Sequence, residues 1–404
     1  MPKLLLITDA CAALEQLAPL HLAASWDNVG LLIGSTSWPA TRALLTIDLT
    51  HAVLKEAIAN RCDFIIAYHP PIFHALKSFT DRTDRESIAL LSAQHKIAVY
   101  SPHTALDAAP DGLNDFLARG LGPGDLRALQ SHQHLPESEE TKIVTFAPAD
   151  AVEKIRNALA AIGAGRIGNY ELCSFEITGA GTFLGNESAS PALGKAGEFK
   201  RVNEVRLEMV CPRAALGLAV LTLREFHPYE EPPIEIYPLL SRPLRHTGLG
   251  RRLVLDTAVP LTTLTDRIKK HLNISSLTVA SANDSAIAQA RTTPSLEGGG
   301  LGVGESTRSS QNAESLISHI GLCAGAGADL IEPAIAQGCR AFLTGEMRHH
   351  EVLAAQARGC TVILAGHTNT ERPYLPAYRD RIKKLLPALE FSISSADAET
   401  LREM

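Results

Sequence analysis

The sequence predicts an α/β protein with a mostly parallel-sheet core, interrupted by an inserted α+β domain of ferredoxin-like order. Short apolar runs alternate with helical segments over residues 1–137, and the same pattern returns over 243–404. Between them, residues 138–242 show a different order of elements. Strands that alternate with helices indicate βαβ units on a parallel sheet. We therefore expect the N- and C-terminal parts to build one core, with 138–242 inserted as a separate domain.

The first half of the core contains strands that stop at polar or proline residues. The run from Asp63 to Tyr68 is almost wholly apolar, which suits a strand covered on both faces. Pro70 and Pro71 then end it, because proline cannot donate to the ladder. The expected elements are a helix over 9–18 with Asp9 as N-cap, strands over 30–34 and 43–49, a helix over 51–60, a strand over 63–68, a helix over 85–95 and a strand over 97–100.

The inserted segment follows a polar connector over residues 136–140. Its expected elements are a strand over 142–147, a helix over 150–162, strands over 172–183 and 203–211, a helix over 213–226 and a strand over 233–237. This βαββαβ order is the ferredoxin-like plan, and a segment of roughly 100 residues is long enough to fold by itself.

The second half of the core resumes near Gly248 and contains a segment of unusual composition. Residues 286–314 are rich in Ser, Thr and Gly, which predicts a flexible excursion. A strand over 316–323 then runs into 324–330, where the glycines fit either a phosphate-binding turn or a tight turn that needs glycine for steric reasons. The remaining expected elements are a strand over 341–344, a helix over 346–358 and a strand over 361–365.

Composition narrows the class of protein. The 404 residues are 45% hydrophobic and 20% charged with a formal net charge of −6, so DNA-scale binding is not expected while a nucleotide substrate stays open. Seven scattered cysteines without a C-x-x-C pair argue against disulfides and thiolate zinc sites. No apolar run approaches the ~18 residues of a membrane span. We expect a soluble cytoplasmic protein without a membrane partner.

Three predicted strand ends carry side chains of types that can bind metals. His69 follows one strand, His103 and Asp107 follow another, and His367 and Glu371 follow the strand over 361–365. The carboxyl ends of parallel strands are where open α/β sheets hold their ligands. Imidazole and carboxylate without thiolate suit zinc, manganese or iron. The spacing alone does not establish that the three ends converge.

Each of these residues also has a structural interpretation. A single histidine such as His69 is more often solvated than a ligand, and Asp107 could cap a helix that begins near Asp111. The adjacent pair His349 and His350 opens the predicted helix over 346–358, where neighbouring side chains diverge by about 100° and cannot face one ion. We leave that pair outside the site.

Five ordered segments resemble the Nif-three-like family, also named GTP cyclohydrolase I type 2 homologues. They are residues 25–31 (SWDNVGL), 68–73 (YHPPIF), 101–107 (SPHTALD), 345–350 (GEMRHH) and 366–371 (GHTNTE). Two further segments, 179–183 (GAGTF) and 227–232 (HPYEEP), resemble the insert of longer family members, which is similar to CutA and PII-like domains. The resemblance covers nearly the whole chain outside 286–314.

The resemblance implies a dinuclear divalent-metal centre in a toroidal homo-oligomer, commonly a hexamer. The matching ligand positions are His69, Asp107, His367 and Glu371, with Glu371 bridging. The family's first motif has two adjacent histidines, and Tyr68 stands at the first of them here. On that match, one metal position keeps His69, Asp107 and Glu371, whereas the other loses an imidazole. We therefore expect one firm metal position and a second that is weaker or absent.

The leading functional hypothesis is a divalent-metal-dependent hydrolase that acts on a nucleotide through metal-bound hydroxide, with GTP ring opening implied by the family name. His103 is the candidate acid or base for the ring nitrogen. Two alternatives stay open. One is a metal-dependent phosphoesterase, and the other is a metal-binding regulatory or interaction protein without turnover, in which the inserted domain senses a ligand.

Overall fold

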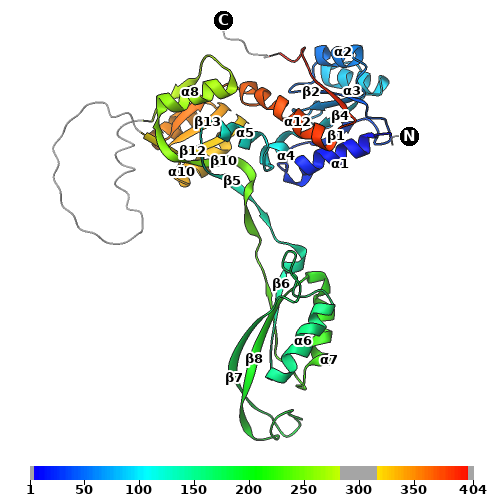
Figure 1. The fold of residues 1–404 in the computed structure, drawn as a ribbon, viewed down its shortest axis with the longest axis vertical. Coiled ribbons are helices and arrows are strands. Elements are labelled where there is room, and N and C mark those ends of the chain that lie inside the picture. The colour runs from blue at the N-terminus through cyan, green and yellow to red at the C-terminus, as the bar shows by residue number, and fades with distance from the viewer. Residues whose placement is uncertain (1–3, 283–315, 399–404) are drawn as a thin grey trace, which may run out of the picture. The chain divides into compact units, whose positions relative to one another are not determined.

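The chain divides into two compact units, each with its own buried core (Figure 1). The computed structural model describes residues 4–282 and 316–398. Unit 1 comprises Met1–His132 and Leu244–Met404, and unit 2 comprises Gln133–Pro243. The predicted flexible excursion over 286–314 lies outside the described residues.

The first sheet of unit 1 has the strand order β1-β4-β3-β2-β15. Its strands are β1 (Gly30–Ile33), β2 (Arg42–Thr46), β3 (Phe64–Ala67), β4 (Ala98–Ser101) and β15 (Glu390–Ile393). All neighbours are parallel except the edge pair β1 and β4. Apolar side chains on one face pack against α1 (Ile7–Leu17) and α12 (Leu375–Leu385). Those on the other face pack against α2 (His51–Ala59) and α3 (Asp84–Gln94).

The second sheet of unit 1 has the order β11-β14-β13-β12-β10-β5. Its strands are β5 (Gly124–His134), β10 (Arg242–Pro260), β11 (Thr278–Ala280), β12 (Leu316–Ala326), β13 (Ala341–Glu346) and β14 (Thr361–Leu364). The central strands β12, β13 and β14 are parallel, whereas β10 and β11 pair antiparallel to their neighbours. Helices α5 (Leu113–Arg119) and α8 (Leu261–Leu272) pack on one face, and α10 (Ile331–Ala336) and α11 (His349–Ala357) on the other.

Each half of the chain contributes a strand to the other half's sheet. The C-terminal strand β15 pairs with β2, and β5 from the first half lies at the edge of the second sheet. This confirms an α/β core built from both parts of the chain, parallel at its centre. It differs from the expectation in containing two sheets, because the order of strands does not follow from their spacing along the chain.

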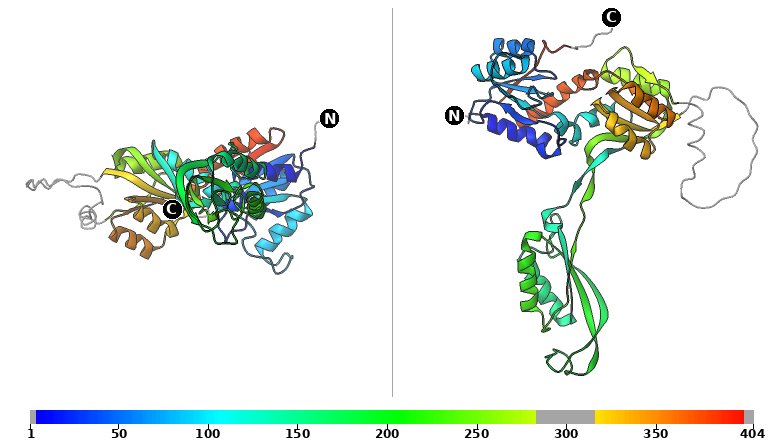
Figure 2. Two further views of the ribbon diagram at one scale, coloured as in Figure 1. Left: turned by 90° about the horizontal axis from the view of Figure 1, so that it is seen from below. Right: turned by 180° about the vertical axis from the view of Figure 1, so that it is seen from behind.

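Unit 2 has the predicted βαββαβ order of elements. They are β6 (Thr141–Ala147), α6 (Ala149–Ala161), β7 (Phe175–Leu184), β8 (Phe199–Cys211), α7 (Leu216–Phe226) and β9 (Ile234–Pro238). The sheet order is β7-β8-β6-β9, and neighbouring strands in it are antiparallel. Figure 2 shows α6 and α7 together on one side of this sheet, where their apolar faces form the core. The likeness to CutA and PII-like domains stays a prediction.

Several predicted boundaries were wrong in ways that matter for the site. Asp9 is not the N-cap of α1 but lies in its first turn, where its carboxylate accepts a hydrogen bond from the Leu6 backbone at 3.1 Å. The strand expected to reach Leu49 ends at Thr46, so Asp48 lies just beyond it. Glu346 ends β13 and does not begin a helix, because α11 starts at His349.

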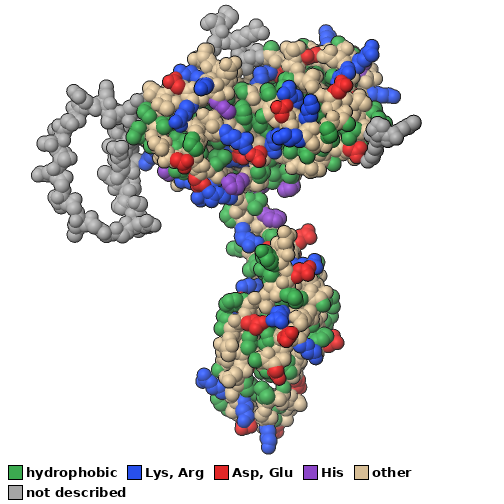
Figure 3. Space-filling model, in the orientation of Figure 1, with side chains coloured by type: hydrophobic (Ala, Val, Ile, Leu, Met, Phe, Trp, Pro, Cys, Tyr) green, Lys and Arg blue, Asp and Glu red, His purple; other side chains and the backbone are tan. Residues whose placement is uncertain are grey.

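The surface carries charges of both signs. On the face drawn in Figure 3, basic and acidic side chains both occur over each unit. Within the described ranges 4–282 and 316–398, we find no helix with the length and apolar character needed to cross a bilayer.

Candidate metal centre

The carboxyl ends of parallel strands from both sheets of unit 1 meet at one place. His69 comes two residues after the end of β3, and His103 begins α4 (His103–Ala108) directly after β4. From the second sheet, His367 follows β14 and Glu371 follows the single turn Thr368–Thr370. Carboxyl strand ends are the usual ligand edge of α/β sheets. The three strand ends therefore do converge in space, which the spacing along the sequence could not establish.

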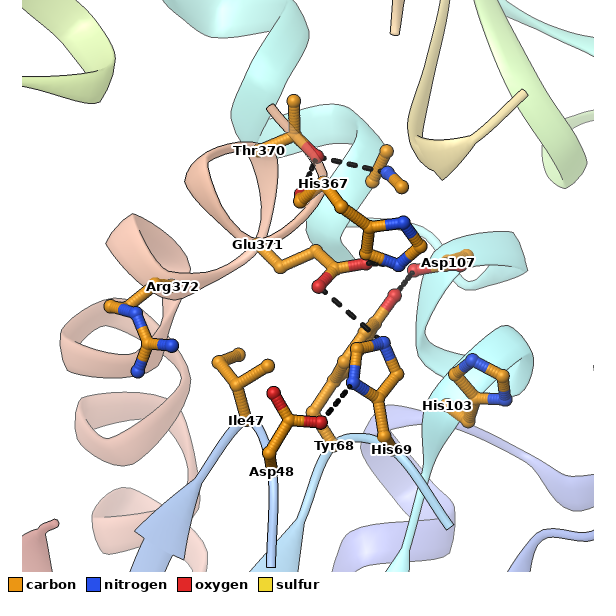
Figure 4. Close-up of polar contacts among 12 residues, drawn as sticks. Ile47, Asp48, Tyr68, His69, His103, Asp107, His367, Thr370, Glu371 and Arg372 are labelled. Carbon is orange, nitrogen blue, oxygen red and sulfur yellow. Dashed lines mark hydrogen bonds and ion pairs between the residues drawn. The ribbon is translucent and has the colours of Figure 1, made fainter. Parts of the chain in front are cut away.

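His69, His367 and Glu371 form a cluster that could hold a metal ion. Each offers one ligand atom, and the three atoms all lie within 4.8 Å of one another. The two carboxylate oxygens of Glu371 face the two rings, with Oε1 3.3 Å from His367 Nε2 and Oε2 3.5 Å from His69 Nε2 (Figure 4). Two imidazoles and one carboxylate are donors that zinc and other divalent transition metals accept.

One oxygen of the buried Glu371 carboxylate has no hydrogen bond among the described residues, although two imidazoles lie near the carboxylate. The Glu371 side chain is only 2% exposed, and the oxygen without a hydrogen bond is Oε2. A buried carboxylate needs both charge pairing and hydrogen bonds, and the two imidazoles leave Oε2 only partly satisfied. A divalent cation would be a partner for this oxygen, so the donor set fits a metal.

Two further carboxylates orient the imidazoles by contacting Nδ1, the ring nitrogen that faces away from Glu371. His69 Nδ1 lies 2.9 Å from Asp48 Oδ1, and His367 Nδ1 lies 3.1 Å from Glu346 Oε1. With Nδ1 held by a carboxylate, each ring directs Nε2 at Glu371, the arrangement that fixes the tautomer of metal-binding histidines. Burial alone would lower the pKa of His69, but its bonds to Asp48 and Glu371 raise that pKa to about 10.

Sequence reasoning gave no role to these two orienting carboxylates. A signal was available, since Asp48 lies two residues after β2 and Glu346 is the last residue of β13. Both strands are parallel and end at the same edge as β3 and β14. The predicted strand end at Leu49 and the predicted helix start at Glu346 obscured this.

Asp107, the fourth predicted ligand, has a different partner. The Tyr68 hydroxyl donates to Asp107 Oδ1 at 2.7 Å, and Asp107 lies outside the three-residue cluster (Figure 4). Burial raises the pKa of the Asp107 carboxyl to about 6 and holds the pKa of Tyr68 well above its ordinary value. The capping alternative for Asp107 was wrong, because it lies within α4 and α5 begins at Leu113 after Gly112.

His103 is held beside the cluster in a strained backbone conformation. Its φ of 27° lies in the region that residues with a Cβ rarely occupy, and such strain gathers at functional sites. Its Nδ1 lies 2.8 Å from Asp27 Oδ1, and its ring centroid lies 5.3 Å from that of His69. Burial would raise the pKa of Asp27, but hydrogen bonds from His103 and Thr104 lower it. Asp27 is a further partner that sequence reasoning missed.

Gly325 explains why the backbone can pass so close to the cluster. Its φ is +59°, and a Cβ there would lie 2.8 Å from Glu371 Oε1 and 3.1 Å from His367 Nε2. This supports the steric interpretation of the glycines in residues 324–330. The pair His349 and His350 is exposed at the start of α11 and outside the cluster, as expected.

A cavity of about 530 Å³ opens onto the cluster. Its lining includes all four predicted ligands together with His103 and Tyr68. Trp26, Phe73 and residues 323–327 also line the cavity. The site is therefore reachable by a small molecule.

The comparisons with known proteins agree with this architecture. The family model for Duf34/NIF3 (NGG1p interacting factor 3) matches residues 5–293 and 296–400. The chain is 32% identical to human NIF3-like protein 1 over 399 residues, which covers 97% of this chain and 90% of the human protein. It is also 32% identical to the Bacillus subtilis GTP cyclohydrolase 1 type 2 homolog over 355 residues, covering 87% and 86% of the two chains.

Solved structures show the same fold. The crystal structure of a Bacillus cereus protein related to NIF3 covers 100% of both chains at 26% identity with a TM-score of 0.62. A Staphylococcus aureus protein covers 99% of both chains at 24% identity with a TM-score of 0.69. With the family model matched over almost the whole sequence, the chain belongs to the Duf34/NIF3 family.

Proposed function

We propose that this protein is a divalent-metal-dependent hydrolase whose metal is held by His69, His367 and Glu371. The observation that carries the proposal is the buried Glu371 carboxylate, which faces two oriented imidazoles and has an oxygen without a hydrogen bond. The 530 Å³ cavity beside it gives a substrate access. Zinc, manganese and iron all accept this donor set. When bound, such an ion lowers the pKa of water and so supplies a nucleophile near neutral pH.

We further propose that one metal position binds firmly and that a second is weak or absent. The resemblance assigns Asp107 to one position with His69 and Glu371, but Asp107 Oδ1 accepts a hydrogen bond from the Tyr68 hydroxyl. The firm position is therefore proposed on His69, His367 and Glu371, which leaves Asp107 for the second position. A phenol with a raised pKa is a hydrogen-bond donor and a poor ligand, so Asp107 joins the metal only if Tyr68 releases it. Asp107 therefore stays in the proposed ligand set as the conditional member.

His103 is the proposed proton carrier of the site. Its Nδ1 is bound to Asp27, which leaves Nε2 as the ring nitrogen that can exchange a proton with a substrate in the cavity. Asp27 also fixes the orientation of the ring, since it accepts hydrogen bonds from the backbone and hydroxyl of Thr104. This positions a general acid or base beside the proposed metal without making it a ligand.

The substrate to test first is a guanine compound, because several relatives carry the name GTP cyclohydrolase 1 type 2 homolog. The protein should be stripped of metal, reloaded separately with zinc, manganese or iron, and incubated with GTP and with guanosine. Formate release tests opening of the purine ring, and metal-free protein with His367→Ala protein serves as control. Absence of formate with every metal and both substrates would rule out this reaction. Phosphate release from GTP would instead favour the phosphoesterase alternative.

A binding protein without turnover is the second candidate. The Tyr68 bond to Asp107 favours it, because it removes a ligand that a two-metal hydrolase would use. Metal that raises thermal stability or drives assembly, with neither formate nor phosphate released, would support this candidate. Light scattering coupled to size-exclusion chromatography tests the proposed homo-oligomer, for which the expected state is a hexamer. A cytoplasmic location remains part of the same proposal.

A further inference from the structure

An exposed tryptophan stands at the wall of the cavity. Trp26 is 61% exposed although large aromatic side chains usually bury most of their surface. It lines the same cavity as His69 and Glu371. Neither the proposed metal ligands nor the proposed proton carrier explains why an aromatic ring of this size is left uncovered there.

The backbone that carries Trp26 is fixed on both sides. The Asp27 carboxylate is bonded to His103, and the backbone N–H of Ala24 donates to Thr104 Oγ1 at 3.0 Å. On the other side, the Asn28 side-chain amide donates to the carbonyl of Ile72. An exposed side chain on an anchored loop is already oriented for a ligand, so little conformational entropy is lost when one binds.

The aromatic rings form a continuous wall toward the metal cluster. The Trp26 centroid lies 5.8 Å from that of Phe73 and 6.2 Å from that of His103. The His103 centroid in turn lies 5.3 Å from that of His69. Nucleobases and similar heteroaromatic rings stack well on such side chains.

The described lining of the cavity has no Arg or Lys to pair with phosphate groups. It does include the acids Asp107, Asp329 and Glu371. Proteins usually neutralise a triphosphate with Arg or Lys side chains or with the N-terminus of a helix. Apart from the histidines and the proposed metal ion, the described lining therefore offers no cationic partner for three added phosphates.

We propose that the cavity binds an uncharged, planar heteroaromatic compound, of the nucleobase or nucleoside class, which stacks on Trp26. Trp26 is then the specificity-determining residue of the site, and a nucleoside triphosphate is not its preferred ligand. This deepens the proposed function by naming the substrate class. It rests on that function for the reaction, although binding of the ring can be measured without any turnover.

The test is calorimetric binding to the full-length, metal-loaded protein. The probes are guanosine, adenosine, uridine, nicotinamide, GTP and ribose 5-phosphate. We expect saturable binding of at least one uncharged ring, no binding of ribose 5-phosphate, and no tightening when guanosine is replaced by GTP. Trp26→Ala should weaken ring binding roughly 5- to 150-fold, the range found when a stacked aromatic is removed. Trp26→Phe should retain affinity within a few fold.

Three results would overturn the proposal: no binding of any uncharged ring, unchanged affinity in Trp26→Ala, or GTP binding at least tenfold tighter than guanosine. Thermal melting of each variant checks folding, and little change is expected because the side chain is exposed. The outcome is separable from that of the formate assay. Ring binding that depends on Trp26 without formate release would refute the hydrolase while supporting the ligand class.

Discussion

Two buried carboxylates in the wall of one cavity differ in their hydrogen-bond partners. Glu371 has an oxygen without a hydrogen bond and faces two imidazoles, each oriented by a carboxylate of its own. Asp107 accepts a hydrogen bond from the Tyr68 hydroxyl and stands outside the cluster. Both residues are acids that follow a parallel strand, and both are predicted metal ligands. The difference shows that the neighbouring donors, and not the residue type, decide which carboxylate is left for a metal.

The largest expected effect comes from Glu371→Gln. The amide keeps the shape of the side chain but removes the charge between the two rings, so we expect metal affinity to fall by more than the roughly 10–100-fold that loss of an orienting partner costs. Metal analysis after dialysis and competition with a chelator measure it. Glu346→Gln, which alters only a partner of His367, is the matched control. Equal metal affinities in the two variants would contradict the claim that Glu371 is a metal ligand and Glu346 only orients one.

Tyr68→His tests whether the hydrogen bond from Tyr68 keeps Asp107 from binding a metal. The substitution removes the donor to Asp107 and adds an imidazole, so we expect bound metal to rise from one ion per chain toward two. Tyr68→Phe releases Asp107 but adds no imidazole, so the second position still lacks a ligand and the count should stay near one. Wild-type protein that already holds two tightly bound ions would contradict the role given to Tyr68. Anomalous scattering from crystals of the metal-loaded protein would locate the ions.

Asp48→Asn should have a smaller effect, because Asp48 touches the metal ligand His69 and not the proposed ion. Loss of such a partner weakens metal binding by roughly 10–100-fold. Asp84→Asn, which changes an exposed acid at the start of α3, is the control and should leave affinity unchanged. Chelator competition at a fixed pH gives both values. No change in Asp48→Asn would mean that His69 is oriented by its surroundings alone.

Glu56 extends the comparison to a carboxylate whose hydrogen bonds are abundant. It accepts hydrogen bonds from Ser394, Ser395 and Ala396, and these offset the effect of burial and lower its pKa from 4.5 to about 2. A lowered folded-state pKa gives stability that is complete above pH 4.5 and is lost as pH falls toward 2. Glu56→Gln should therefore destabilise by about 1–3 kcal/mol at pH 7.

The difference in unfolding free energy between wild-type and Glu56→Gln protein should decrease steadily as the pH falls from 4.5 to 2. Denaturant unfolding of metal-free protein at pH 7, 4.5 and 3 measures it, with metal omitted so that the cluster does not contribute. If the difference in unfolding free energy is as large at pH 3 as at pH 7, the variant acts through packing and not through the ionised carboxylate.

Local pattern was sufficient for most elements and insufficient at their ends. The run before Tyr68 and the alternation in residues 141–147 each formed the predicted strand within a few residues. The errors at Leu49 and Glu346 arose because both residues continue a favourable local pattern. Hydrogen bonding to neighbouring strands sets where a strand ends, and that information is not local.

The sequence by itself determined the α/β core, the order of elements in unit 2, the family, and three histidine- and carboxylate-bearing strand ends. Periodicity, proline and glycine positions and ordered motifs carry this information because each depends on residues close together in the chain. Only the tertiary structure decided that two sheets face one cavity, that Asp48, Glu346 and Asp27 orient the histidines, and that Tyr68 holds Asp107. These side-chain contacts join residues 21 to 76 positions apart, and only packing brings them within hydrogen-bonding distance.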